Sequence, residues 1–395
     1  MSTADPIVIS SFARTPMGGF QGALAGATAS ELGATAVKAA VERSGVSPEE
    51  VDRIYMGCVL SAGQGQAPAR QAALGAGLPK SVEATTLNKM CGSGMQAAIM
   101  AAEALAAGTA DIIIAGGMES MTNAPFLMQK HRAGARIGHD VVYDSMMLDG
   151  LEDAYDKGKA MGVFAEDTAR TYQFTREAQD AFAIESLARA NKAIGSGAFD
   201  SEVVPVTIKG RGGDTQVIAD EQPGKAKPDK IPTLKPAFVK DGTVTAANAS
   251  SISDGAAAMV MTRESVATTK GLKVEARVVA TAAHAHEPAL FTTAPVPAIR
   301  KLLDKAGWSV ADVDLFEVNE AFAVVTMVAM HELGIPHDKV NVNGGATALG
   351  HPIGASGARV IATLIAALKN RGLKKGVAAL CIGGGEATAI AIELV

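Results

Sequence analysis

The cysteine at position 91 has a setting that could make its thiol a nucleophile. Cys91 lies in the run Asn-Lys-Met-Cys-Gly-Ser-Gly, directly before a predicted helix over 95–107. Glycines permit a sharp turn there, and a helix N-terminus offers unpaired backbone N–H groups and a favourable dipole. Both favour a thiolate, and the N–H groups could bind an oxyanion. Two other interpretations stay open: Cys91 is a small core residue, or Gly92–Ala97 is a dinucleotide-binding G-x-G-x-x-A motif, although the residues before it do not form a convincing strand pattern.

Three more side chains stand where they could act on protons or donate a hydrogen bond. His351 lies between glycines and before Pro352, a turn that could aim its ring as a donor or base. Cys381 follows a predicted strand over 377–380, at the edge where open α/β sheets bind ligands. Asn319 also follows a predicted strand and could be an amide donor. The ordinary alternatives are a structural loop histidine, a core thiol and a helix-capping asparagine.

The elements that would position these residues alternate between strand and helix. Apolar runs at 7–11, 53–56 and 111–115 predict buried strands, and the patterns over 31–44 and 95–107 predict helices. This alternation is typical of βαβ units and predicts a mostly parallel sheet that helices cover on both faces.

The C-terminal third of the chain repeats this plan. Three segment pairs recur in the same order at nearly one offset: 44–55 with 306–317, the Gly-Ser-Gly at 92–94 with the Ala-Ser-Gly at 355–357, and 111–117 with 376–385. The pairs indicate two similar half-domains. Chance similarity between Ala- and Gly-rich segments is the alternative.

The stretch between the halves, roughly 121–249, has a different composition. Basic residues gather near its start, and Lys209–Lys240 is rich in Pro, Gly, Lys and Asp. This composition predicts an excursion with long loops. Such loops often contact ligands, although most of the charges here are expected to be solvated surface.

Length and composition exclude several classes of protein. A chain of 395 residues predicts two or three folded units. A formal net charge of -5 argues against non-specific nucleic-acid binding. Three cysteines do not make a disulfide framework, and the longest apolar stretches fall short of the ~18 residues that span a membrane. His284-Ala-His286-Glu287 lacks a third spaced ligand, so no metal site is expected. Without a signal segment, the cytoplasm is the expected location.

Several motifs in fixed order resemble the thiolase family, in particular its biosynthetic type. They cover essentially the whole chain: Arg14–Pro16, Asn88–Gly94, Gly116–Met121, Gly242–Ser250, Asn319–Phe322, Gly350–Gly354 and Cys381–Gly385. The resemblance implies an α/β thiolase-like fold in which two βαβ half-domains form a five-layered αβαβα arrangement. The implied units are 1–120 plus 250–272, a loop domain over 121–249 for CoA binding and oligomerisation, and 273–395.

The resemblance also implies an acyltransferase that joins two acetyl-CoA molecules into acetoacetyl-CoA and CoA, or cleaves 3-ketoacyl-CoA with CoA. Cys91 would carry the acyl group after His351 takes its proton, and Cys381 would remove the α-proton of the second substrate. His351 and a water held by Asn319 would stabilise the enolate. The backbone N–H groups of Cys91 and Gly383 would bind the tetrahedral oxyanion. CoA thioesters are substrates, and no permanently bound cofactor is implied.

Family likeness places CoA along the middle segment. The matching positions are Ser250 and Ala246 at the pantetheine, with Leu151, Met161, Ala321 and Phe322 along the tunnel and acyl end. Three positions depart from the family pattern. Ala160 replaces a histidine, Phe291 replaces a methionine near the acyl pocket, and Pro223 replaces a basic residue, so Lys225 or Lys227 could meet the CoA phosphates.

The family forms homodimers and homotetramers, and one of these is expected here. Other activities stay open. One is a degradative thiolase of broader chain length, and another is a ketoacyl or hydroxymethylglutaryl-CoA synthase of similar fold. A thiolase-like protein that binds acyl-CoA or lipid without turnover is the non-enzymatic alternative. Cys381, which offers a thiol as base, favours a thiolase over the synthases.

Overall fold

One ten-stranded sheet system runs through the molecule. The computed structural model describes residues 5–395, so the start of the predicted first unit at residue 1 lies outside the described residues. Its sheet order is β12-β13-β14-β11-β1-β10-β5-β3-β4, with β2 beside β10. The first-half elements are β1 (Ile7–Arg14), β2 (Gly18–Gly19), α1 (Ala29–Ser44), β3 (Arg53–Gly57), α2 (Pro68–Gly75), β4 (Glu83–Leu87), α3 (Ser93–Ala106), β5 (Ile112–Ser120), β10 (Ser253–Arg263) and α7 (Glu264–Lys270).

The second half repeats the arrangement of the first. Its elements are β11 (Ala276–Ala285), α8 (Pro295–Ala306), β12 (Leu315–Val318), α9 (Ala323–Leu333), α10 (Ala346–Leu349), α11 (Ser356–Arg371), β13 (Lys375–Ile382) and β14 (Glu386–Leu394). The order β3-β5-β10-β1 of one half corresponds to β12-β13-β14-β11 of the other. The two halves join where β1 and β11 pair over three residues.

The strand directions correct the expectation of a mostly parallel sheet. Strands β1, β3, β4 and β5 run one way, but β10 runs antiparallel between β1 and β5. Strand β14 likewise runs antiparallel between β11 and β13, and the joint of β1 with β11 is antiparallel. β10 and β14 are buried along most of their length, so their hydrophobic pattern does not reveal their direction.

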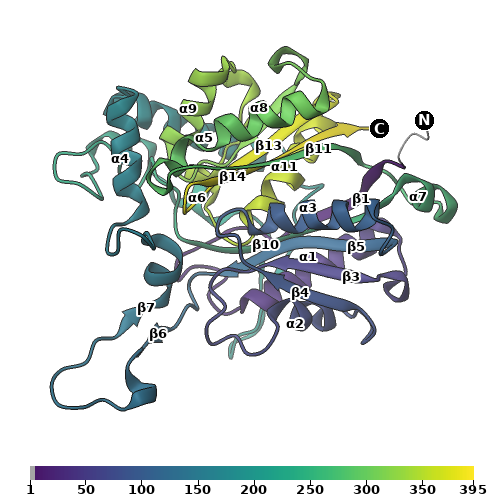
Figure 1. The fold of residues 1–395 in the computed structure, drawn as a ribbon, viewed down its shortest axis with the longest axis horizontal. Coiled ribbons are helices and arrows are strands. Elements are labelled where there is room, and N and C mark those ends of the chain that lie inside the picture. The colour runs from purple at the N-terminus through teal and green to yellow at the C-terminus, as the bar shows by residue number, and fades with distance from the viewer. Residues whose placement is uncertain (1–4) are drawn as a thin grey trace.

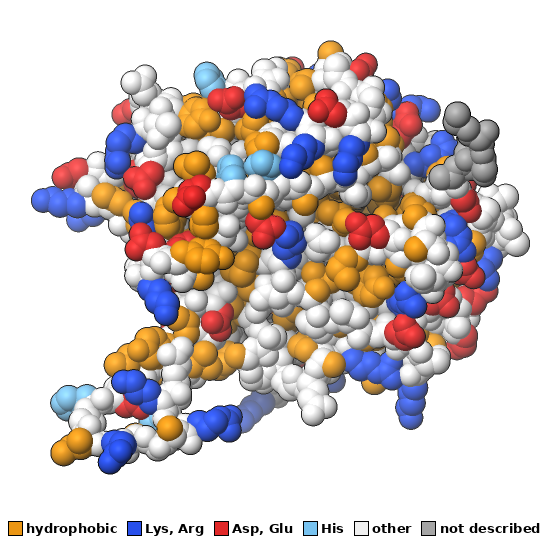
Figure 2. Space-filling view, viewed as in Figure 1, with side chains coloured by type: hydrophobic (Ala, Val, Ile, Leu, Met, Phe, Trp, Pro, Cys, Tyr) orange, Lys and Arg blue, Asp and Glu red, His pale blue; other side chains and the backbone are white. Residues whose placement is uncertain are grey.

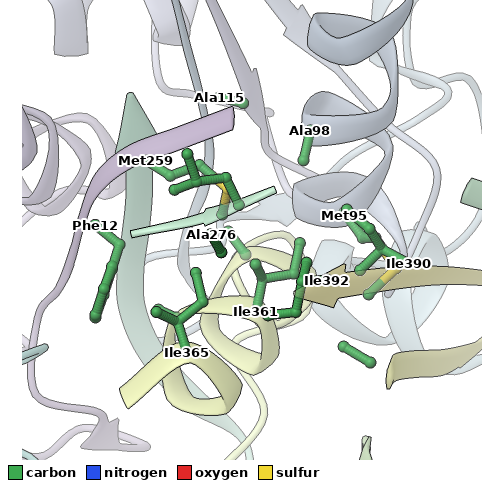
Figure 3. Packing of buried hydrophobic residues seen from close by; sticks show 14 of the residues in the cluster. Phe12, Met95, Ala98, Ala115, Met259, Ala276, Ile361, Ile365, Ile390 and Ile392 are labelled. Carbon is green, nitrogen blue, oxygen red and sulfur yellow. The ribbon is translucent and has the colours of Figure 1, made fainter. Parts of the chain in front are cut away.

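Five layers are visible in Figure 1, which confirms the predicted αβαβα arrangement. The single sheet forms two layers, one from each half of the chain. Helices α8 and α9 cover the sheet layer of the second half, α1 and α2 cover that of the first half, and α3 and α11 lie between the two sheet layers. The buried cluster of the central layer draws on both halves. Figure 3 shows Met95 of α3 and Ile361 of α11 among side chains from β10 and β14, such as Met259 and Ile390.

The middle segment contains more helix than the predicted excursion with long loops. Its elements are β6 (Phe126–Leu127), β7 (Tyr143–Asp144), the π-helical turn Met147–Leu151, α4 (Met161–Thr171), α5 (Arg176–Gly195), β8 (Val206–Ile208), β9 (Thr215–Val217) and α6 (Glu221–Lys225). Leu187 and Ala190 of α5 pack against Leu349 of α10, so tertiary burial stabilises this helix. An arm over 127–142 projects from the body in Figure 1.

A buried ion pair network connects the middle segment to β1. The Arg14 guanidinium donates to the carboxylates of Glu202 at 2.9 Å and Asp220 at 2.7 Å, and all three side chains are buried. Arg14 thereby reaches two separate parts of the middle segment. Loss of one partner would leave a charge buried and uncompensated.

Helices α3 and α11 approach so closely that glycine is required on both. A Cβ on Gly94 would lie 2.7 Å from the Ala358 backbone nitrogen, and one on Gly357 would overlap the Met95 backbone nitrogen. The N-termini of the two helices therefore meet backbone against backbone. Because Cys91 precedes α3 and His351 precedes α11, this contact brings their turns to one place in the molecule.

We predict that Gly357→Ala destabilises the fold by about 1–3 kcal/mol, because the new methyl group would collide with backbone and not with a movable side chain. Gly195→Ala is the matched control. Gly195 also lies in a helix but has open space around it, so alanine there should be neutral or stabilise by up to about 1 kcal/mol. Urea unfolding of both variants measures the difference, and equal stabilities would contradict the close contact.

Candidate active site

The turn that carries Cys91 is held by its own side chains. Met90 has φ of 47°, a left-handed conformation that is uncommon for a residue with a side chain. The Asn88 side chain accepts from Met90 N at 2.9 Å, and Ser93 Oγ donates to Met90 O at 2.7 Å. A Cβ on Gly92 would overlap Ile382 at the end of β13. The Cys91 turn therefore lies directly against the strand end that carries Cys381.

Cys91 lies close enough to Cys381 to influence the ionisation of the Cys381 thiol. Burial raises the pKa of Cys381 well above its usual value, and the charge of Cys91 raises it further. Burial raises the pKa of Cys91 to about 11, against backbone hydrogen bonds from Gly383 and from Cys91 itself that lower it. The N–H groups that the sequence predicts as an oxyanion site are thus directed at the Cys91 sulfur. Both cysteines are neutral thiols near pH 7.

His351 is buried, and one of its ring nitrogens has no partner. Nδ1 lies 2.6 Å from Ser356 Oγ, whereas Nε2 is buried without a hydrogen-bond partner among residues 5–395. Burial lowers the pKa of His351 to about 3, and the Arg359 charge contributes in the same direction. The imidazole is therefore neutral in the resting protein.

Asn319 presents a free amide group in the same way. Its backbone N–H donates to Ala379 O at 3.0 Å, which fixes it beside β13. Its Oδ1 accepts from Arg359 Nη2 at 3.4 Å, and its buried Nδ2 has no partner within the described chain. Because the oxygen faces Arg359, the nitrogen is left as a donor for another group.

A buried carboxylate that the sequence did not identify as important connects three segments around these residues. Glu119, in β5, accepts from the backbone N–H groups of Val59, Leu60 and Gly354 at 3.0, 3.1 and 2.9 Å. Burial raises its pKa to about 7. Glu119 thereby fixes the turn that follows His351 to the first half of the molecule. The Gly116–Met121 motif was the available signal, but it carries no indication of this contact.

The predicted acyl-end residues surround Cys381. Phe291, Ala321, Phe322 and Met161 belong to one apolar cluster with it, and Phe291 makes an edge contact with Phe322 at 6.4 Å between ring centroids. Three further predicted positions lie near this cluster: Leu151 packs near Met90 and Cys91, Ser250 N donates to Ala321 O, and Gly383 lies in the turn after β13.

The predicted CoA contacts divide between two cavities. Ala246, Lys225 and Lys227 line a cavity of about 330 Å³, and Lys230 joins them there. Lys225 also pairs with Glu221. Met161 and Gly383 line a separate cavity of about 590 Å³. The lysines and Met161 therefore line different cavities, as the two ends of an extended substrate would require.

The remaining candidates take no part in this arrangement. Cys58 is buried beside Glu119, and burial raises its pKa strongly. His286 Nε2 lies 2.9 Å from Leu290 O, so this nitrogen already has a hydrogen-bond partner. Across residues 5–395 no group of three or more His, Cys, Asp or Glu side chains could hold a metal. No helix of the described chain is long and apolar enough to cross a membrane.

Comparisons with known proteins give one consistent result. The family models described as thiolase, N-terminal domain and thiolase, C-terminal domain match residues 7–265 and 272–394. A relative from Saccharomyces cerevisiae named acetyl-CoA acetyltransferase is 51% identical over 393 residues, with 98% of each chain covered. One of the same name from Thiocystis violacea is 49% identical over 393 residues, with 99% of each chain covered.

Solved structures agree with the sequence matches. The crystal structure of the Bacillus anthracis acetyl-CoA acetyltransferase superposes with a TM-score of 0.97 at 42% identity and 100% coverage of both chains. A thiolase from Ascaris suum in complex with coenzyme A superposes with a TM-score of 0.93 at 43% identity, covering 99% of this chain and 100% of that one. The similarity therefore extends through both halves and the middle segment.

We predict that alkylation of Cys91 by iodoacetamide accelerates about tenfold per pH unit between roughly pH 7 and pH 10. A thiol with a pKa of about 11 is mostly protonated in this range, so each unit raises the thiolate fraction about tenfold. Mass spectrometry of Cys91 peptides measures the rate, and a Cys91→Ser variant reports labelling of the two buried cysteines. A plateau below about pH 8 would instead indicate a resting thiolate–imidazolium pair.

Proposed function

The chain belongs to the thiolase family, and from this membership we propose that it is an acetyl-CoA acetyltransferase. It joins two acetyl-CoA molecules into acetoacetyl-CoA and CoA, and in reverse it cleaves a 3-ketoacyl-CoA with CoA. The observation that carries the proposal for this chain is a second thiol, Cys381, held buried next to Cys91. One sulfur accepts the acyl group and the other exchanges the α-proton.

In the first half-reaction the Cys91 sulfur attacks the thioester carbonyl of acetyl-CoA. His351 Nε2 takes the thiol proton, a role supported by its burial and its lack of a partner. The tetrahedral oxyanion is bound by the N–H groups of Cys91 and Gly383. The CoA thiolate leaves and takes the proton of Cys381. The result is acetyl-Cys91, an imidazolium at His351 and a thiolate at Cys381.

The second half-reaction uses the charges that the first one created. The Cys381 thiolate removes the α-proton of a second acetyl-CoA, and its raised pKa makes it a strong base. The enolate oxygen is stabilised by the His351 imidazolium and by a water on Asn319 Nδ2. The carbanion attacks acetyl-Cys91, and the departing Cys91 sulfur recovers its proton from His351. All three groups return to their starting states.

The substrate is bound along the two cavities. Lys227 and Lys230 supply positive charge for the CoA phosphates, while Lys225 shares its charge with Glu221. Ser250 and Ala246 lie at the pantetheine, and Leu151, Met161, Ala321 and Phe322 border the channel towards the acyl end. A long, narrow thioester fits a binding site that is basic at the phosphate end and apolar at the acyl end.

The active form is a homodimer or homotetramer. The arm over 127–142 and its base expose several large hydrophobic side chains, namely Phe126, Met128, Ile137, Val141 and Val142. Hydrophobic side chains are visible along this arm at the lower left of Figure 2. An apolar patch of this kind on an extension is typical of a subunit contact.

The three free cysteines fit a reducing compartment, which supports a location in the cytoplasm.

A specific observation also favours a broader acyl range, as in a degradative thiolase. Phe291 packs between Phe164 and Phe322 in the cluster around Cys381, so it forms part of the acyl-end wall. Ala160 directly precedes α4 and has a smaller side chain than the histidine that the family usually has there. Both changes alter the shape of the pocket without removing a reacting group.

The proposed chemistry predicts an acetyl adduct on Cys91 after incubation with acetyl-CoA. Intact and peptide mass spectrometry would detect it, and Cys91→Ser should abolish both the adduct and turnover while leaving the fold intact. Cys381→Ser should still form the adduct but fail to condense, because a hydroxyl in place of the thiolate is a far weaker base at neutral pH. Condensation by Cys381→Ser at the wild-type rate would contradict the role of Cys381.

We predict that Phe291→Met and Ala160→His shift activity towards acetoacetyl-CoA and away from longer 3-ketoacyl-CoAs. One altered apolar contact is worth about 1–3 kcal/mol, or roughly 10- to 200-fold in discrimination. Thiolysis rates across chain lengths, with CoA omitted as the control, measure this preference. Unchanged activity ratios in both variants would show that these two positions do not set chain length.

A further inference from the structure

The hydrogen-bond partner of His351 has only one proton to give. Ser356 is the first residue of α11 and is fully buried. Its Oγ lies 2.6 Å from His351 Nδ1 and 2.9 Å from the Pro352 carbonyl oxygen. A carbonyl oxygen can only accept, so the single hydroxyl proton goes to Pro352. The short contact to His351 then requires Nδ1 to be the donor.

We propose that Ser356 is a positioning residue that keeps neutral His351 protonated at Nδ1, so that the lone pair of the unpartnered Nε2 is free to accept a proton. This inference rests on the proposed function, in which Nε2 takes the proton of Cys91. A ring protonated at Nε2 could not accept that proton from its cavity side. Ser356 therefore acts on the reaction through His351 and does not touch the substrate.

The surrounding backbone leaves the ring and the hydroxyl little freedom. The His351 backbone N–H donates to Ser251 O at 3.1 Å, and Gly354 N donates to Glu119 at 2.9 Å. The Pro352 carbonyl also accepts from the backbone N–H groups of Ala355 at 2.9 Å and Ser356 at 3.0 Å. The acceptor of the hydroxyl proton is thus fixed by the same turn that carries the histidine.

A neutral hydroxyl also suits the two charge states that the reaction needs. A carboxylate at Nδ1 would stabilise the imidazolium at rest. A neutral hydroxyl such as that of Ser356 does not, so the buried ring stays neutral until Nε2 takes the proton of Cys91. Once Nε2 is protonated, Nδ1–H still donates to Ser356, and Nε2–H becomes the donor for the enolate oxygen. One fixed contact thereby serves both half-reactions.

The protonation state of the wild-type enzyme can be measured without any variant. Histidine side-chain ¹⁵N NMR at neutral pH, with His351→Asn to assign the signal, should show a protonated Nδ1 and an unprotonated Nε2. Neutron diffraction is the second measurement, and it should place the hydrogen on Nδ1. A hydrogen on Nε2 in the resting enzyme would overturn the proposal.

Variants separate positioning from folding. Ser356→Ala should slow Cys91 acetylation by about 10- to 100-fold, part of the ~10²–10⁴ that a positioned base contributes, and should mix the two tautomers. Ser356→Thr keeps a hydroxyl at this position and should retain most of the wild-type rate of Cys91 acetylation. Thr363→Val removes another buried hydroxyl of α11 and should change neither the rate nor the tautomer.

The outcomes distinguish this inference from the proposed function. If wild-type protein forms no acetyl adduct on Cys91, the proposed function fails first. If the adduct forms normally but Ser356→Ala retains both the wild-type acetylation rate and the Nδ1 proton, only the role of Ser356 is wrong. Should Ser356→Ala not fold, the wild-type NMR signal and Ser356→Thr still decide the question.

Discussion

The contact between the N-termini of α3 and α11 is the constraint on which the site depends. No side chain separates Gly94 from Ala358 or Gly357 from Met95, so the two helices meet at backbone distance. Cys91 precedes one helix and His351 precedes the other, and each turn is then fixed by its own hydrogen bonds. A larger residue at the contact would move both turns at once, which is why a packing detail governs the chemistry.

Burial gives this site its resting charge state. Burial raises the pKa of both thiols and lowers that of the imidazole, so the reacting groups start neutral. In the proposed reaction, burial would keep water from the atoms that become charged, and the N–H donors already in place would compensate for that charge. The nitrogens of His351 and Asn319 that are buried without a partner are the groups that would contact a substrate in the proposed reaction.

The sequence predicted the five layers and the repeated half-domains, and the structure and the comparisons confirm them. It missed the direction of β10 and β14, since strands buried on both faces look alike whichever way they run. It also missed α4 and α5, which are stabilised by tertiary packing. The roles of the site residues remain predictions. Contacts such as Glu119 with Gly354 join positions far apart in the chain and leave no local pattern to read.

The shared central core has a consequence for how such a fold could originate. The buried cluster between the sheets takes residues from both halves, so either half alone would expose the apolar face of its central helix. A half-length ancestor would have needed a second copy of itself to cover that face, and its paired sites would have been identical. Fusion into one chain would have freed the copies to diverge. At the ends of the corresponding strands β5 and β13, one half holds the buried carboxylate of Glu119 and the other the buried sulfur of Cys381.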